Sequence, residues 1–113
     1  MVESCVFCKI VSGELKADIV YRDDQVTAFR DIEPQAPVHI LIVPNEHVRT
    51  PNDLRTPALA SALFLTATEL ARREGLADRG YRLAMNSGPE GGQAVQHLHL
   101  HLLGGRRMAW PPG

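Results

Sequence analysis

The chain has 113 residues, a length that fits one domain and leaves no room for a second full core. Its 12 basic and 13 acidic residues give a formal net charge of −1, which argues against a protein that coats nucleic acid. With 44% hydrophobic residues, disorder is not expected. No apolar run approaches the ~20 residues that cross a bilayer, and no signal-peptide pattern follows Met1. We therefore expect one cytoplasmic domain, residues 1–113, without nucleic-acid or membrane partners.

The N-terminal half predicts one short helix followed by three strands. The helix covers residues 5–11 and ends at Ser12-Gly13, a turn signal. Two short strands, 20–21 and 26–29, are close enough in sequence to form a hairpin. The run 38–43 is rich in β-branched residues and flanked by prolines, which favours a buried strand over a helix.

The C-terminal half predicts one long helix and then two strands. Residues 57–74 carry an apolar stripe at helical spacing, with Thr56 as N-cap and Gly75 as terminator. Strands are predicted at 81–85 and 95–103. Most connections are too short for parallel crossovers. The fold class is therefore α+β, with about five antiparallel strands, one long helix and a short N-terminal helix.

A row of alternating histidines is the sharpest chemical feature. The histidines are His97, His99 and His101, and the residues between and after them are Leu98, Leu100 and Leu102. On a strand the imidazoles share one face and the leucines the other. This face could be merely solvated, could hold a metal ion with three imidazoles, or could carry a nucleophilic histidine that attacks phosphorus. Spacing alone does not choose between the two functional interpretations.

The two cysteines form a Cys-x-x-Cys pair at Cys5 and Cys8. Secreted disulfide scaffolds carry more cysteine than this and spread it along the chain. In a reducing compartment the pair indicates half of a metal site or a redox couple.

The segment 97–103, His-Leu-His-Leu-His-Leu-Leu, resembles the signature of the histidine triad family. The similarity covers nearly the whole chain and is closest to the purine nucleoside phosphoramidase (Hint) branch. The other matching segments are 31–39, 86–88, 91–93 and 110–113. In isolation each has an ordinary explanation, such as a turn carboxylate or a plain loop, but together they favour this branch.

The resemblance implies a nucleotidyl-histidine mechanism with His99 as the nucleophile. His101 and His39 would assist by binding phosphate or orienting the nucleophile. Asp31 would hold the ribose, because one carboxylate has acceptors for both hydroxyls. The other implied nucleotide-binding residues are Phe7, Phe29, Ile32 and Leu41 around the purine, Asn86, Gly92 and Gln93 at the phosphate, and Trp110 from the tail.

The resemblance also implies a structural zinc site and a homodimer. The zinc ligands would be Cys5, Cys8, His47 and His97, a tetrahedral set of two thiolates and two imidazoles. Because His97 cannot also serve an all-histidine metal site, His99 and His101 stay free of metal. No organic cofactor is expected. Members of the family form two-fold dimers with a continuous sheet, and the tail 104–113 would reach the partner's site.

The expected function is hydrolysis of purine nucleoside phosphoramidates, AMP-type substrates first. The alternatives are a dinucleoside polyphosphate hydrolase of the same family, a nucleotide-binding regulatory adaptor, and a catalytic metalloenzyme. One residue departs from the pattern, because Ala94 stands where the branch usually has a serine after Gln93. A hydroxyl there would help the leaving group depart, so we expect weaker catalysis with amine leaving groups.

Overall fold

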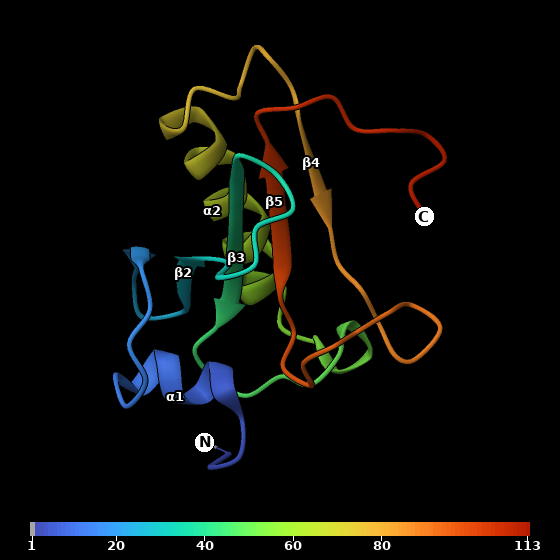
Figure 1. Ribbon diagram of the computed structural model, residues 1–113. Helices are drawn as coiled ribbons and strands as arrows, with labels where there is room; N and C mark the ends of the chain where they lie inside the picture. Colours follow the sequence, from blue (N-terminus) through green and yellow to red (C-terminus); the bar gives the residue numbers. More distant parts are fainter. Residues whose placement is uncertain (1) are drawn as a thin grey trace.

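The structure, a computed structural model, describes residues 2–113, and within them five antiparallel strands form one sheet in the order β1-β2-β3-β5-β4 (Figure 1). The strands are β1 (Ile19–Arg22), β2 (Val26–Arg30), β3 (Val38–Pro44), β4 (Tyr81–Ala84) and β5 (Leu100–Gly104). The helices are α1 (Val6–Ser12), a short 3₁₀ turn η1 (Pro51–Asp53) and α2 (Pro57–Arg73). This confirms the predicted α+β class. No helix in residues 2–113 combines the length and apolar content that a membrane span requires.

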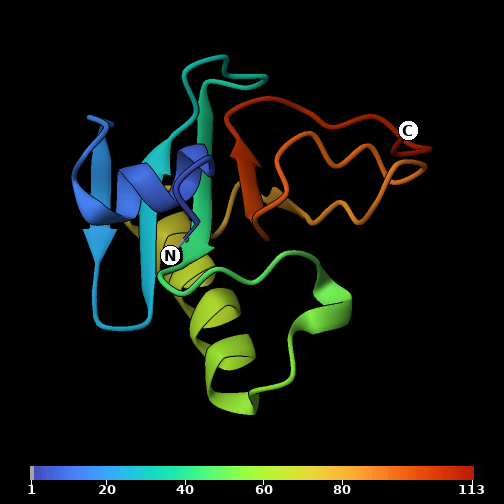
Figure 2. The ribbon, with the colours of Figure 1, turned by 90° about the horizontal axis from the view of Figure 1, so that it is seen from below.

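Alternation along the strands sends apolar side chains to both faces of the sheet. On β3, Ile40 and Ile42 belong to the main cluster, which also contains the buried face of α2. Leu41 and Val43 belong to a second cluster, which contains Phe7 of α1. The two helices therefore cover different faces, as Figure 2 shows from below.

The local signals placed most of the helix and turn boundaries correctly. Cys5 is the N-cap of α1, and its Sγ accepts a hydrogen bond from the Cys8 N–H at 3.4 Å. Gly13 closes this helix with φ 85°, a left-handed conformation that suits glycine. Thr56 occupies the N-cap position of α2 as expected, but its side chain makes no capping hydrogen bond.

The last strand is shorter than predicted, because β5 begins at Leu100 and not at residue 95. Its partner β3 ends at Pro44, and proline has no N–H to continue the ladder. The Leu98 N–H bonds instead to the Val48 carbonyl at 2.7 Å. The side-chain alternation nevertheless starts before the strand, since Leu98, Leu100 and Leu102 are all buried in the main cluster.

Candidate active site

A cavity of about 590 Å³ opens on the α1 side of the sheet. Its size lies in the roughly 300–1,000 Å³ range of small-molecule sites. The cavity brings together many of the predicted site residues, namely Phe7, Phe29, Asp31, Ile32, His39, Leu41, His99 and His101. Sequence reasoning missed Ile10 and Val95 in its wall. Ile10 lies one helical turn after Phe7, so the spacing of α1 could have revealed it.

His99 is held with one ring nitrogen fixed and the other free. The ring is buried, and its Nδ1–H donates to the His97 carbonyl at 2.8 Å. In the neutral ring the lone pair therefore lies on Nε2. Phe7 packs against the imidazole with ring centroids 5.1 Å apart at 82°. These contacts orient His99 as a nucleophile would need to be oriented.

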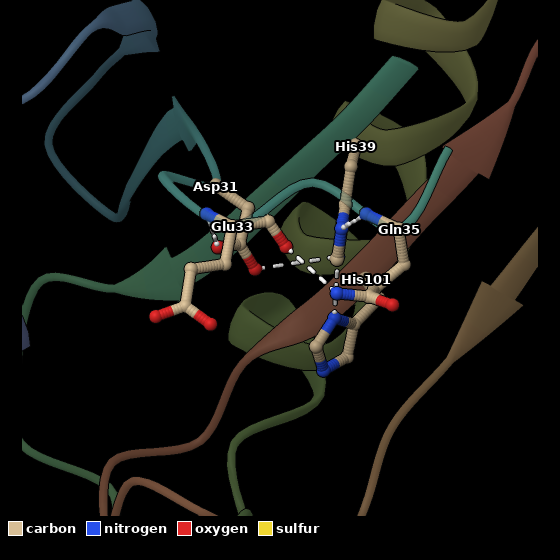
Figure 3. A network of polar contacts seen from close by, with 5 residues as sticks. All are labelled: Asp31, Glu33, Gln35, His39 and His101. Carbon is tan, nitrogen blue, oxygen red and sulfur yellow. Dashed lines mark hydrogen bonds and ion pairs between the residues drawn. The ribbon is translucent and has the colours of Figure 1, made fainter. Parts of the chain in front are cut away.

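A chain of hydrogen bonds fixes the protons of His39 and His101 (Figure 3). The Gln35 backbone N–H donates to His39 Nδ1 at 3.0 Å, so His39 carries its proton on Nε2. That Nε2–H donates to His101 Nδ1 at 2.9 Å, which leaves the proton of His101 on its own Nε2. Among residues 2–113, His101 Nε2 is the one buried side-chain N or O atom without a hydrogen-bond partner. This orphaned donor suits an oxygen of a bound phosphate.

Burial keeps both members of this chain neutral. It lowers the pKa of His101 to about 4, with further lowering from nearby His99 and His39 and partial opposition from Asp31. Burial also lowers the pKa of His39, and the Asp31 carboxylate opposes that shift. At pH 7 each ring therefore carries one proton, as the hydrogen bonds require.

Asp31 lies beside this chain of hydrogen bonds, and each of its carboxylate oxygens has a different neighbour. Its Oδ1 accepts the Glu33 N–H at 2.9 Å, and its Oδ2 lies 3.5 Å from His39 Nε2 (Figure 3). Because His39 is neutral, this is a polar contact and not an ion pair. The Asp31 side chain lies in the wall of the cavity, where its oxygens can accept hydrogen bonds from a ligand.

Four of the predicted nucleotide-binding residues lie outside the lining of this cavity. They are Asn86, Gly92, Gln93 and Trp110. The buried Gln93 side chain holds its own loop, since Oε1 accepts the Gly88 N–H at 3.0 Å and Nε2 donates to the Arg49 carbonyl at 2.8 Å. Gly92 has φ 77°, which a glycine adopts at little cost. Trp110 is 81% exposed.

The four predicted zinc ligands do converge. Potential ligand atoms of Cys5, Cys8, His47 and His97 all lie within 4.8 Å of one another. His97 Nδ1 is 3.3 Å from Cys5 Sγ and 3.6 Å from Cys8 Sγ. His47 Nδ1 is 3.4 Å from Cys8 Sγ. Tetrahedral zinc with ordinary bond lengths would place S and N ligand atoms about 3.6 Å apart.

The environment of His97 also fits a metal ligand. Its Nε2–H donates to the Pro44 carbonyl at 2.9 Å, so the lone pair of Nδ1 points toward the sulfurs. Burial lowers the pKa of His97 to about 4, which keeps the ring neutral as a ligand must be. The four residues therefore could hold a zinc ion. The second group in residues 2–113 that could bind a metal, Asp31 with His39 and His101, belongs to the cavity described above.

A buried imidazole with a free Nε2, an unpaired N–H donor and an apolar slot define a small-molecule site with a histidine nucleophile. Comparison with known proteins agrees with this class. Residues 12–108 match the HIT domain, and the chain belongs to this family of histidine triad proteins.

Individual relatives are similar over nearly the full length. The chain is 51% identical to the purine nucleoside phosphoramidase of Escherichia coli K12, over 96% of this chain and 92% of that protein. It is 46% identical to a 14 kDa zinc-binding protein of Brassica juncea, over 96% and 98%. A crystal structure of a HIT family hydrolase from Legionella pneumophila Philadelphia 1 superposes with a TM-score of 0.95 at 51% identity, over 97% of this chain and all of that one.

Proposed function

We propose that this protein hydrolyses purine nucleoside phosphoramidates, AMP-type substrates first, through a nucleotidyl-histidine intermediate. The observation that carries the proposal is the fixed proton of His99, which leaves Nε2 free in a nucleotide-sized cavity. The similarity to a purine nucleoside phosphoramidase supports the same reaction. The purine would lie against the apolar wall that Phe7 and Phe29 form together, and the ribose hydroxyls would donate to Asp31.

In the first displacement, His99 Nε2 forms a bond to the α-phosphorus while the P–N bond breaks. The leaving nitrogen keeps the bonding electron pair and takes up a proton from solvent, so it departs as a neutral amine. The imidazole of the intermediate then carries positive charge, which the His97 carbonyl stabilises through the bond to Nδ1–H. His101 Nε2–H donates to a phosphoryl oxygen, where negative charge develops.

In the second displacement, a water oxygen forms a bond to phosphorus and the bond to His99 Nε2 breaks. The electron pair returns to Nε2, the water proton is lost to solvent, and the nucleoside monophosphate leaves. His39 does not touch phosphorus in this scheme. Its Nε2–H fixes the proton position of His101, so it is a positioning residue.

The substrate class is tested by comparing turnover of adenosine 5′-phosphoramidate with that of a diadenosine polyphosphate. We expect a higher kcat/KM for the phosphoramidate, measured by chromatographic detection of AMP. A higher value for the dinucleotide would assign the chain to the sibling activity. Absence of turnover with both, while AMP still binds, would favour a regulatory adaptor.

We also propose that Cys5, Cys8, His47 and His97 bind a structural zinc ion. A bound zinc would join the N-terminus to the segment just before β5, because Cys5 and Cys8 belong to α1 and its cap whereas His97 lies two residues before the nucleophile His99. Zinc with four protein ligands has no open position for substrate, so the ion would have a structural role. The relative named as a zinc-binding protein supports the assignment.

We infer that the chain is one HIT domain over residues 1–113 and forms a homodimer through the sheet edge. Within residues 2–113, β4 pairs only with β5, and its other edge could pair with a second copy. The exposed Trp110 on the tail 104–113 would then reach the partner's site. Sedimentation equilibrium should give twice the mass of one chain, and a monomer at micromolar concentration would contradict this. The cytoplasmic location stays a prediction, in keeping with the two free thiols.

A further inference from the structure

A second cavity, of about 440 Å³, adjoins the candidate active site. Val6, Ala94 and Val95 line both cavities, so the two meet along a shared wall. The nucleophile His99 lines the first cavity together with Ala94. Ala94 has the smallest side chain of these three shared residues. A substrate group that reaches past this wall would meet the residues that line the second cavity.

The second cavity has a positive electrostatic character. Among the described residues, Arg49 is the one charged side chain in its lining, and no carboxylate lies there. Ser4 and Gln96 add a hydroxyl and a carboxamide to the lining, and the proposed zinc ligands Cys5 and His47 also border the cavity. Arg49 also borders a separate cavity that contains Glu46 and Asp53, but it forms no ion pair with any of residues 2–113. Its charge is therefore available to an anionic ligand.

The backbone that carries Arg49 is held beside the active-site loop. Gln93 Nε2 donates to the Arg49 carbonyl at 2.8 Å and to the Val95 carbonyl at 3.0 Å. The Gln93 side chain is buried, so these two bonds are protected from water. The same amide thus connects the wall of the first cavity to the cation of the second. Such a connection reduces the ordering that a ligand would otherwise impose on this side of the site.

We propose that this second cavity is a leaving-group subsite with Arg49 as its specificity-determining residue. It favours nucleoside phosphoramidates whose leaving amine carries an anionic group, such as an amino acid attached through its nitrogen with a free carboxylate. The inference rests on the proposed phosphoramidase function and specifies its substrate class. It also gives Ala94 a role, because this small residue lies between the cavity of His99 and the cavity of Arg49.

The test compares two substrates that differ only in one charge, the adenosine 5′-phosphoramidates of alanine and of alaninamide. For the wild-type protein we expect kcat/KM to be higher for the carboxylate. Arg49→Ala should lower the carboxylate-to-amide ratio about fivefold, and Arg49→Glu should lower it further. Arg49→Lys should retain most of it. The wild-type preference should shrink as salt screens the charge. Because the ratio is internal to each variant, a general loss of active protein does not change it.

Arg55→Ala is the matched control, because Arg55 is an exposed arginine that lines only the neighbouring cavity. It should leave the ratio unchanged. Equal ratios in the wild type and Arg49→Ala, or an equal drop in Arg55→Ala, would overturn the subsite. Turnover of the unsubstituted adenosine 5′-phosphoramidate separates the two proposals. If the wild type cleaves it but shows no charge preference, only the subsite fails; if the wild type does not cleave it, the proposed function fails.

Discussion

Replacing His99 by asparagine is expected to lower kcat for adenosine 5′-phosphoramidate by about 10⁴-fold or more, because the covalent route is lost. Asparagine is polar and smaller than histidine, and it can still donate to the His97 carbonyl, so the fold should persist. His101→Asn should cost about 10²-fold, the effect of losing one donor to the transition-state charge. The measurement is steady-state turnover, with AMP affinity as a check that the cavity remains intact.

Acid-free quenching and peptide mapping provide the direct test of the same idea. The wild type should carry a trapped AMP adduct on His99, and His99→Asn should carry none. A label on another residue would move the nucleophile, and turnover within tenfold of wild type in His99→Asn would refute the covalent mechanism. His39→Asn removes only the group that orients His101, so its loss of kcat should be smaller than that of His101→Asn.

Replacing Cys8 by serine should release the zinc ion and lower the free energy of unfolding by about 4 kcal/mol, the scale at which lost metal sites stand out among point mutations. Cys8 is fully buried among the other ligands, so no neighbour can replace its thiolate. Metal analysis should find about one zinc per wild-type chain and far less in the variant. Denaturant titration measures the stability difference.

Two controls separate metal loss from ordinary packing loss. A chelator should destabilise the wild type toward the Cys8→Ser value and leave the variant unchanged. Ser12→Ala is a matched substitution in the same helix, where an exposed hydroxyl bonds the Lys9 carbonyl at 3.1 Å. It should cost less than about 1 kcal/mol. The proposed site would be contradicted by a wild-type protein that contains no zinc, or by a free energy of unfolding that the chelator does not change.

Local patterns in the sequence predicted the helices and the hairpin because their causes are local. Gly13 terminates α1 through a backbone conformation that glycine adopts freely, and the helical spacing of α2 is visible in its own residues. The start of β5 depended on a distant residue. Whether the chain can pair before Leu100 is decided by Pro44 on β3, and no pattern within residues 95–103 shows which strand will lie beside them.

The sequence predicted the side chains of the site but not the backbone groups that orient them. The motif identified His39, His99 and His101, but their proton positions depend on main-chain groups of Gln35 and His97. Nearly every residue has a backbone carbonyl and amide, so the sequence does not show which of them form hydrogen bonds with the histidines. The second cavity could not be predicted either, because Arg49 and Ala94 are far apart in the chain. They line the same cavity in the folded structure, where the buried Gln93 side chain bonds to the Arg49 carbonyl.

The sheet separates two apolar clusters, and this separation has a consequence for how the protein can change over evolutionary time. Leu98, Leu100 and Leu102 anchor β5 in the cluster beneath α2, whereas Phe7, Phe29 and Leu41 belong to the cluster that faces the cavity. Mutational drift among the cavity-facing residues can reshape ligand preference while the larger cluster goes on supporting the scaffold. A combinatorial library confined to that face should therefore yield many folded members with diverse selectivity.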